Sequence, residues 1–211
     1  MDVVNETILT NGEWFGPKPG NDKWENPWLQ LGLDQNGYPN YIVKAFDIAS
    51  EFATNKKLIF NQNGGMQKEM WNKVKQTVLY LRSLGLRVDG IGWQGHLKLG
   101  QSTYDFVNDF DNQINELSNL IDWAHNNDLE FHITELDYFV KEGENLDIEL
   151  EKQYNIYNSI IELLNNKSNN GVVTLNFWDL GIREKNNKGI FHSIYDNKLE
   201  PTLIYNLIRS N

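Results

Sequence analysis

Short apolar runs alternate along the whole chain with longer stretches in which apolar residues recur every three or four positions. This alternation is typical of βα units arranged around a parallel sheet. The apolar runs predict five strands, at residues 2–5, 57–61, 88–93, 129–135 and 172–178. The periodic stretches predict five helices, at residues 39–52, 66–84, 109–125, 148–164 and 202–208. The Asn-rich connectors are typical of turns rather than of domain linkers, so the sequence predicts one α/β domain.

Polar and aromatic side chains stand where each predicted strand ends. In chain order they are Asn5 and Glu6, Asn61, Gln94 and His96, Glu135 and Asp137, and Trp178 and Asp179. In parallel α/β folds, ligands bind at the carboxyl edge of the sheet, where residues from several strands converge. Polar residues also end strands for purely structural reasons, but five such ends together favour a binding site at this edge.

Among the carboxylates at these strand ends, Glu6 and Glu135 stand at equivalent ends of two strands that are three βα units apart. Across the mouth of a barrel, side chains at such positions can face each other. Two carboxyl groups about 5 Å apart are the arrangement for retaining glycoside hydrolysis, in which one attacks the sugar and the other transfers the proton. Spacing along the chain by itself only suggests this pairing.

Composition excludes several other classes of protein. With 19 basic and 29 acidic residues the net charge is −10, and a nucleic-acid binder normally shows a basic face. A hydrophobic share of 40% and seven Trp residues indicate a folded core. The negative charge therefore argues against a nucleic-acid partner. No apolar run approaches the ~20 residues of a membrane span, so no membrane partner is expected either. The absence of Cys excludes disulfides, thiolate catalysis and zinc sites built on sulfur.

Three short segments, which occur in a fixed order along the chain, distinguish among the remaining classes of protein. They are Asp2-Val3-Val4-Asn5-Glu6, Gly90-Ile91-Gly92-Trp93-Gln94-Gly95-His96 and Ile133-Thr134-Glu135-Leu136-Asp137. They closely resemble the signature segments of glycoside hydrolase family 10, the retaining endo-β-1,4-xylanases. The resemblance implies that Glu6 is the general acid/base at the end of barrel strand 4 and Glu135 the nucleophile at the end of strand 7. The hydrophobic pattern gives the same three-strand separation.

The resemblance also implies roles for the other strand-end residues. Asn5 would donate to the 2-hydroxyl of the sugar, His96 would orient the nucleophile with Gln94 beside it, and Trp178 would be a stacking platform for xylose. Asn61 is a further substrate-binding candidate. It opens a segment, 61–64, that stands where the family has an Asn-Asp-Tyr-Asn-like run and that lacks the aromatic residue. The family's second late tryptophan is not evident either. The implied substrate is xylan or a xylo-oligosaccharide, with no cofactor and no metal.

If the first strand corresponds to barrel strand 4, residues 1–211 form a single incomplete (β/α)₈ barrel domain that holds strands 4 to 8 and lacks the first three βα units. Open sheet edges and exposed inward aliphatic side chains then predict that the chain alone is a dimer, an aggregate or loosely packed, with little activity. Its partner would be the missing amino-terminal part of the barrel or a second copy. The family implies a secreted protein, although no signal peptide follows Met1.

Two alternatives stay open at this point. The chain is a non-catalytic or partner-dependent xylanase fragment that binds β-1,4-linked sugars, or it is an unrelated open α/β domain that binds a small ligand at the strand ends. A Gly-rich phosphate loop after the first strand would favour the second alternative, and the sequence contains none there. Sequence alone leaves open whether 211 residues is the natural length.

Overall fold

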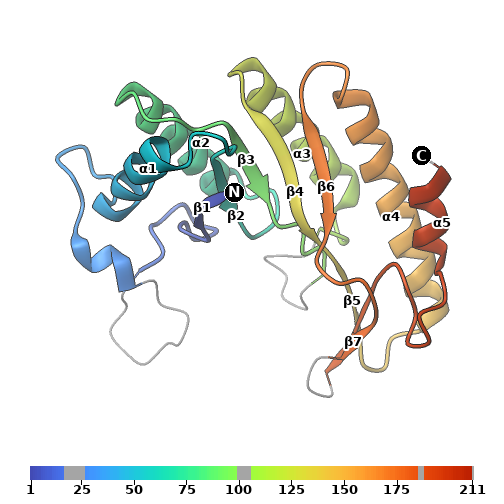
Figure 1. Cartoon of the computed structure of the whole chain (residues 1–211). Coiled ribbons are helices and arrows are strands. Elements are labelled where there is room, and N and C mark those ends of the chain that lie inside the picture. The colour runs from blue at the N-terminus through green and yellow to red at the C-terminus, as the bar shows by residue number, and fades with distance from the viewer. Residues whose placement is uncertain (17–26, 99–105, 185–187, 211) are drawn as a thin grey trace.

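The computed structural model describes residues 1–16, 27–98, 106–184 and 188–210. Five parallel strands form the main sheet in the order β1-β2-β3-β4-β6 (Figure 1). Their bounds are Asp2–Asn5 (β1), Ile59–Gln62 (β2), Gly90–Trp93 (β3), Glu130–Leu136 (β4) and Val173–Phe177 (β6). The predicted α/β class is confirmed, and each of the five strands lies within two residues of its predicted bounds.

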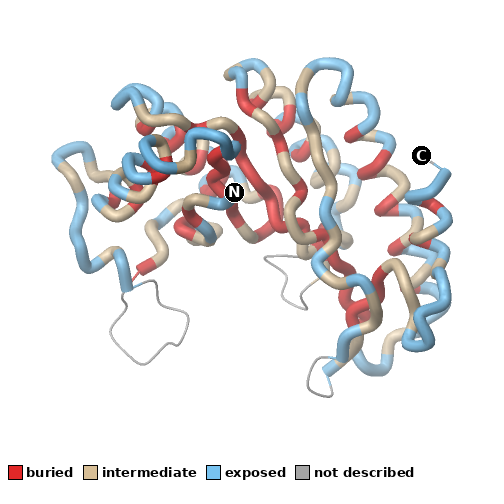
Figure 2. The backbone as a smooth tube through the Cα atoms, in the orientation of Figure 1, coloured by how far each residue is buried: buried red, intermediate tan, exposed pale blue. Residues whose placement is uncertain are grey.

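Helices follow the strands and cover one side of the sheet (Figure 1). Their bounds are Asn40–Phe52 (α1), Lys68–Ser83 (α2), Phe110–Asn126 (α3), Leu146–Lys167 (α4) and Leu203–Ser210 (α5), with a short 3₁₀ helix, η1, at Pro27–Leu31. The core lies between the helices and the sheet (Figure 2). At one end Phe46 of α1 stacks on Phe60 of β2, and at the other Tyr157 of α4 packs against Phe177 of β6.

The other face of the sheet is largely polar. Along β4, Phe131 and Ile133 are fully buried, while His132 and Thr134 alternate with them on the opposite face. His132 Nδ1 lies 2.8 Å from Thr174 Oγ1 on the neighbouring strand. This corrects the expectation of exposed inward aliphatic layers for this part of the face, because its side chains are polar and form hydrogen bonds with one another.

A second, antiparallel sheet was not predicted from the sequence. It has the order β5-β8-β7, with β5 at Tyr138–Lys141, β7 at Arg183–Glu184 and β8 at Gly189–His192. Strand β5 begins one residue after β4 ends, so its apolar residues fell within the loop predicted to follow β4. The small sheet brings Arg183 beside the carboxyl end of β4.

Strands β1 and β6 are the two edges of the main sheet. Beside β1, a groove of about 680 Å³ runs between the strand, η1 and α1. Large apolar side chains that line this groove are exposed, among them Trp28, Leu31 and Ile48. Among the described helices, none has the length and apolar character needed to cross a membrane.

Candidate active site

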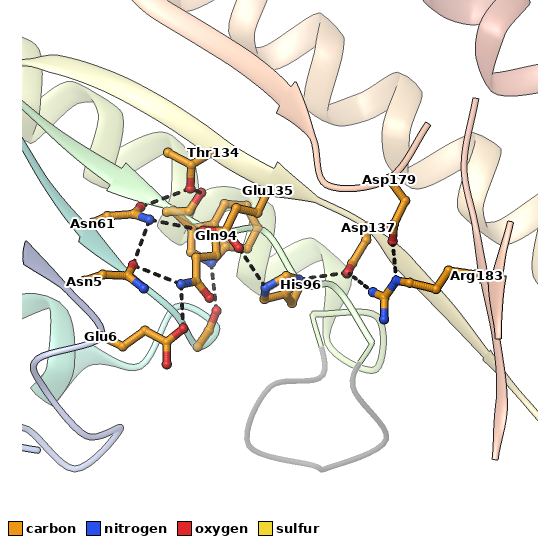
Figure 3. A network of polar contacts seen from close by, with 12 residues as sticks. Asn5, Glu6, Asn61, Gln94, His96, Thr134, Glu135, Asp137, Asp179 and Arg183 are labelled. Carbon is orange, nitrogen blue, oxygen red and sulfur yellow. Dashed lines mark hydrogen bonds and ion pairs between the residues drawn. The ribbon is translucent and has the colours of Figure 1, made fainter. Parts of the chain in front are cut away.

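The carboxyl ends of β1 to β4 meet in one hydrogen-bonded network (Figure 3). Asn5 Oδ1 accepts hydrogen bonds from Asn61 Nδ2 at 3.0 Å and from Gln94 Nε2 at 3.1 Å. Gln94 Nε2 also donates to Glu6 Oε1 at 2.8 Å. Asn61 Nδ2 also donates to Glu135 Oε1 at 3.3 Å. Three amide side chains therefore connect the two candidate carboxylates.

The parallel register places these amides side by side. Asn5 pairs with Asn61 across β1 and β2, and Asn61 pairs with Gly92 across β2 and β3. A Cβ atom on Gly92 would lie 2.4 Å from Asn61 Oδ1, so only glycine leaves room for this side chain. Thr134 Oγ1 then donates to Asn61 Oδ1 at 3.0 Å. Asn61 is fully buried, and these contacts fix its orientation.

Glu6 has an unusual backbone conformation for a residue with a side chain. Its φ is 53°, in the left-handed region, which costs an L-residue about 1–2 kcal/mol. The Glu6 N–H still donates to the Asn61 carbonyl at 3.2 Å, so it makes the last bond between β1 and β2 before the chain turns away. Backbone strain of this kind persists where the surrounding structure holds it, and it is frequent at functional sites.

His96 lies between two carboxylates. Its Nε2 is 3.4 Å from Glu135 Oε2, and its Nδ1 is 3.0 Å from Asp137 Oδ2. The second contact is an ion pair rather than a well-aligned hydrogen bond. Burial lowers the pKa of His96, but the contacts and charges of Asp137 and Glu135 outweigh it and raise the pKa to about 9. At neutral pH the imidazole is therefore a cation that holds one oxygen of Glu135.

A second set of groups surrounds this histidine. Burial raises the pKa of Asp137, against the lowering effect of His96 and Arg183. Arg183 Nη2 lies 3.9 Å from Asp137 Oδ2, and Arg183 Nε donates to Asp179 Oδ2 at 2.9 Å. Trp178 is 54% exposed, and its ring stands edge-on to His96 with the centroids 6.3 Å apart. An open aromatic surface thus adjoins the polar network.

The structure brings together all seven candidate residues, six in the polar network and Trp178 at its border. The sequence placed Asp137 among the strand-end residues but assigned it no role, and it assigned none to Thr134 or Arg183. The period-two alternation of β4 places Thr134 on the same face as His132, which is a usable signal. The position of Arg183 depends on the small sheet, which was not predicted. Among the described residues, no cluster of three or more His, Asp or Glu side chains fits a metal ion.

The raised pKa of His96 predicts a pH-dependent stability. Its folded-state pKa of about 9 lies above the ordinary value of 6.5, so protonation stabilises the fold. This contribution is complete below about pH 6.5 and is lost as the pH rises through about 9. The unfolding free energy should fall by on the order of 3 kcal/mol over this window, as measured by urea denaturation. In the His96→Gln variant this decline should be absent, and an equal decline in both proteins would contradict the assignment.

Comparison with known proteins identifies a family. The family model "Glycosyl hydrolase family 10" matches residues 1–211. The chain is 30% identical to endo-1,4-beta-xylanase A of Thermoanaerobacterium saccharolyticum, over 77% of this chain and 12% of that protein. It is 27% identical to endo-1,4-beta-xylanase B of Thermotoga neapolitana, over 99% of this chain and 54% of that protein. The chain thus spans little more than half of the second relative and much less of the first.

Solved structures show the same fold. Native xylanase 10B from Thermotoga maritima superposes with a TM-score of 0.76 at 23% identity, covering 99% of this chain and 58% of that one. Xylanase 10B from Thermotoga petrophila, in complex with xylobiose, gives a TM-score of 0.73 at 24% identity and the same coverage of 99% and 58%.

Proposed function

The chain belongs to glycosyl hydrolase family 10, and from that premise we propose that it carries the catalytic pair of a retaining endo-β-1,4-xylanase. One observation carries the proposal. Glu6 and Glu135, from the ends of β1 and β4, are connected through the side chains of Asn5, Asn61 and Gln94. A two-carboxylate mechanism needs both groups at one sugar, held in fixed orientations.

In the proposed reaction, Glu135 attacks the anomeric carbon while Glu6 protonates the leaving oxygen. Glu6 then takes a proton from water, and the resulting hydroxide oxygen displaces Glu135 from the sugar. Asn61 binds one oxygen of Glu135 and the His96 cation faces the other, so the nucleophile has little freedom to rotate. These contacts support a positioned nucleophile.

Two residues would hold the sugar itself. Asn5 uses its Oδ1 within the network, while its Nδ2 has no hydrogen-bond partner among the described residues. That N–H group is therefore available for a sugar hydroxyl. Trp178 offers an exposed ring beside His96, and the apolar face of a xylose stacks on such a ring. The xylobiose complex of the Thermotoga petrophila relative supports a xylo-oligosaccharide as substrate.

The charges near the site favour a neutral polymer. Lys98 Nζ lies 2.7 Å from both Glu144 and Glu149, and Arg183 binds Asp179. Lys98 and Arg183 are thus already paired, as is the His96 cation, whereas a uronic-acid polymer would need unpaired cations. In a gel-retardation assay the chain should bind xylan more tightly than polygalacturonate. The reverse order would contradict this substrate class.

We further propose that β1, β2, β3, β4 and β6 correspond to barrel strands 4 to 8, and that three further βα units complete the ring. The open edges at β1 and β6, and the coverage of 58% of the Thermotoga maritima structure, support this. The exposed Ile48 of α1 lines the groove beside one of these edges.

The chain alone should therefore self-associate and turn over xylan slowly. A polypeptide that supplies the three units should restore both a compact species and turnover, as measured by size-exclusion chromatography and release of reducing sugar. A sharp monomer peak with normal hydrolysis by the chain alone would contradict the partial barrel. Xylan binding without hydrolysis, even after complementation, would favour the non-catalytic sugar-binding alternative.

A further inference from the structure

The side chain of Gln62, at the end of β2, is fully buried and contacts the backbone that follows Glu6. Its Oε1 accepts hydrogen bonds from the N–H groups of Thr7 at 3.2 Å and Ile8 at 3.3 Å. Its Nε2 donates to the Ile8 carbonyl at 2.8 Å and to Asn63 Oδ1 at 2.8 Å. Both acceptor sites and both N–H groups of this amide are therefore used.

These contacts continue the pairing of β1 with β2 beyond the point where their backbones separate. The last backbone bond between the two strands runs from the Glu6 N–H to the Asn61 carbonyl, at 3.2 Å. Because Glu6 has a φ of 53°, the chain then turns away from β2. The Gln62 side chain bridges the gap and binds both backbone groups of Ile8, as a neighbouring strand would.

The segment that Gln62 binds is one side of a small hairpin. The Thr7 carbonyl accepts from the Phe15 N–H and the Leu9 N–H donates to the Glu13 carbonyl, both at 2.8 Å. These bonds point toward the partner side of the hairpin. The N–H and C=O of Ile8 point the other way, as alternate residues of a strand do, and Gln62 satisfies both.

We propose that Gln62 is a positioning residue for Glu6. By holding Thr7 and Ile8, it keeps the chain in the turn that requires the left-handed conformation of Glu6 and that presents the Glu6 carboxylate to Gln94. The inference rests on the proposed role of Glu6 as the general acid. It assigns to Gln62 no contact with substrate and no part in the proton transfer itself.

To make these contacts, a side chain at this position must both donate and accept hydrogen bonds, and it must be as long as a glutamine. Methionine has nearly the same length and no hydrogen-bonding group of comparable strength, so Gln62→Met removes the three bonds to Thr7 and Ile8. Gln62→Glu keeps an oxygen that accepts from the two N–H groups, while an ionised carboxylate cannot donate to the Ile8 carbonyl. The two variants should therefore displace Glu6 to different degrees.

The chain offers a matched control in Gln153 of α4. Gln153 is 1% exposed and its Nε2 donates to a backbone carbonyl, that of His192 at 2.9 Å. Gln153→Met thus removes a buried amide and its backbone contact in a different part of the fold. It should destabilise the chain without changing Glu6.

The test uses NMR on the isotope-labelled 211-residue chain in the complemented protein and compares the parent with the three variants. In Gln62→Met, the Glu6 N–H to Hα coupling and the side-chain amide signals of Gln94 should move away from their parent values. Gln62→Glu should give a smaller change in the same direction, and it carries the test if Gln62→Met does not fold. Gln153→Met should leave these signals unchanged. Parent-like Glu6 and Gln94 signals in the folded Gln62 variants, or equal changes in the control, would overturn the proposal.

Turnover gives a second readout that a merely structural role would not move. On aryl xylobiosides in the complemented protein, Gln62→Met should lose about tenfold or more in kcat with a poor leaving group and much less with a good one, because a displaced acid matters only where protonation is needed. Equal losses on both would overturn the positioning role. If the parent hydrolyses no xyloside while the NMR changes occur as expected, the proposed function fails and the positioning of Glu6 by Gln62 stands.

Discussion

Replacing Glu135 by Gln is expected to lower kcat for xylan by several orders of magnitude in the chain supplied with the three further βα units. The substitution keeps the size of the side chain and its capacity to accept from Asn61, but an amide does not attack the anomeric carbon. The measurement is the initial rate on an aryl xylobioside, with the folded state checked by circular dichroism.

Glu130 provides the matched control on the same strand. It lies at the amino end of β4, where its Oε1 is 2.5 Å from Lys57 Nζ, and it takes no part in the strand-end network. Glu130→Gln removes the same charge at the other end of the strand, so its turnover should stay close to the parent's. Activity of Glu135→Gln within tenfold of the parent would exclude Glu135 as the nucleophile.

Glu6→Ala should impair hydrolysis in a way that depends on the leaving group. With a poor leaving group the loss should reach about 10²- to 10⁴-fold, the range that general acid catalysis contributes. With an activated aryl group, which departs without protonation, the first step should be much less affected. The measurement compares kcat/KM for two aryl xylobiosides that differ only in the acidity of the phenol.

Glu13→Ala is the control for this series, because Glu13 is an exposed carboxylate in the hairpin that follows Glu6. It should leave both rates near the parent's. Equal losses of Glu6→Ala on the two substrates would argue that this residue supports the fold or binding rather than proton transfer.

Much of the main sheet could be predicted from the sequence because each of its strands is followed by polar or aromatic residues of the kinds found in binding sites. Apolar residues precede Asn5 and Asn61 and alternate with polar ones before Glu135. Parallel strands bring their carboxyl ends to one edge, so predicting the strands also located the candidate site. The start of α1 was nearly right. Pro39 was expected within the first helical turn, and it is the residue just before the helix.

Other features depend on contacts that a linear pattern does not record. In the small sheet β5 pairs with β8, about 50 residues further along the chain, and β7 has only two residues, so neither left a local periodicity. The turn at Glu6 comes from side-chain contacts of Gln62, and no local rule predicts a left-handed glutamate. The polar face of β4 is different, because His132 and Thr134 alternate visibly with apolar residues in the sequence. This polar pattern was not used in the prediction, because aliphatic layers were expected on that face of the sheet.

The central claim is that Glu135 forms a covalent bond to the sugar, while Glu6 donates a proton to the leaving group and later accepts one from water. The most direct measurement is to incubate the complemented protein with a 2-deoxy-2-fluoro-xylobioside that has an activated leaving group. The fluorine slows both steps of a retaining mechanism and the leaving group restores the first, so the glycosyl-enzyme intermediate accumulates. Mass spectrometry of the digested protein should find one fluoroxylobiosyl group, on the peptide that contains Glu135, and none in Glu135→Gln. Turnover of xylan without any such label, or a label on another carboxylate, would contradict the account.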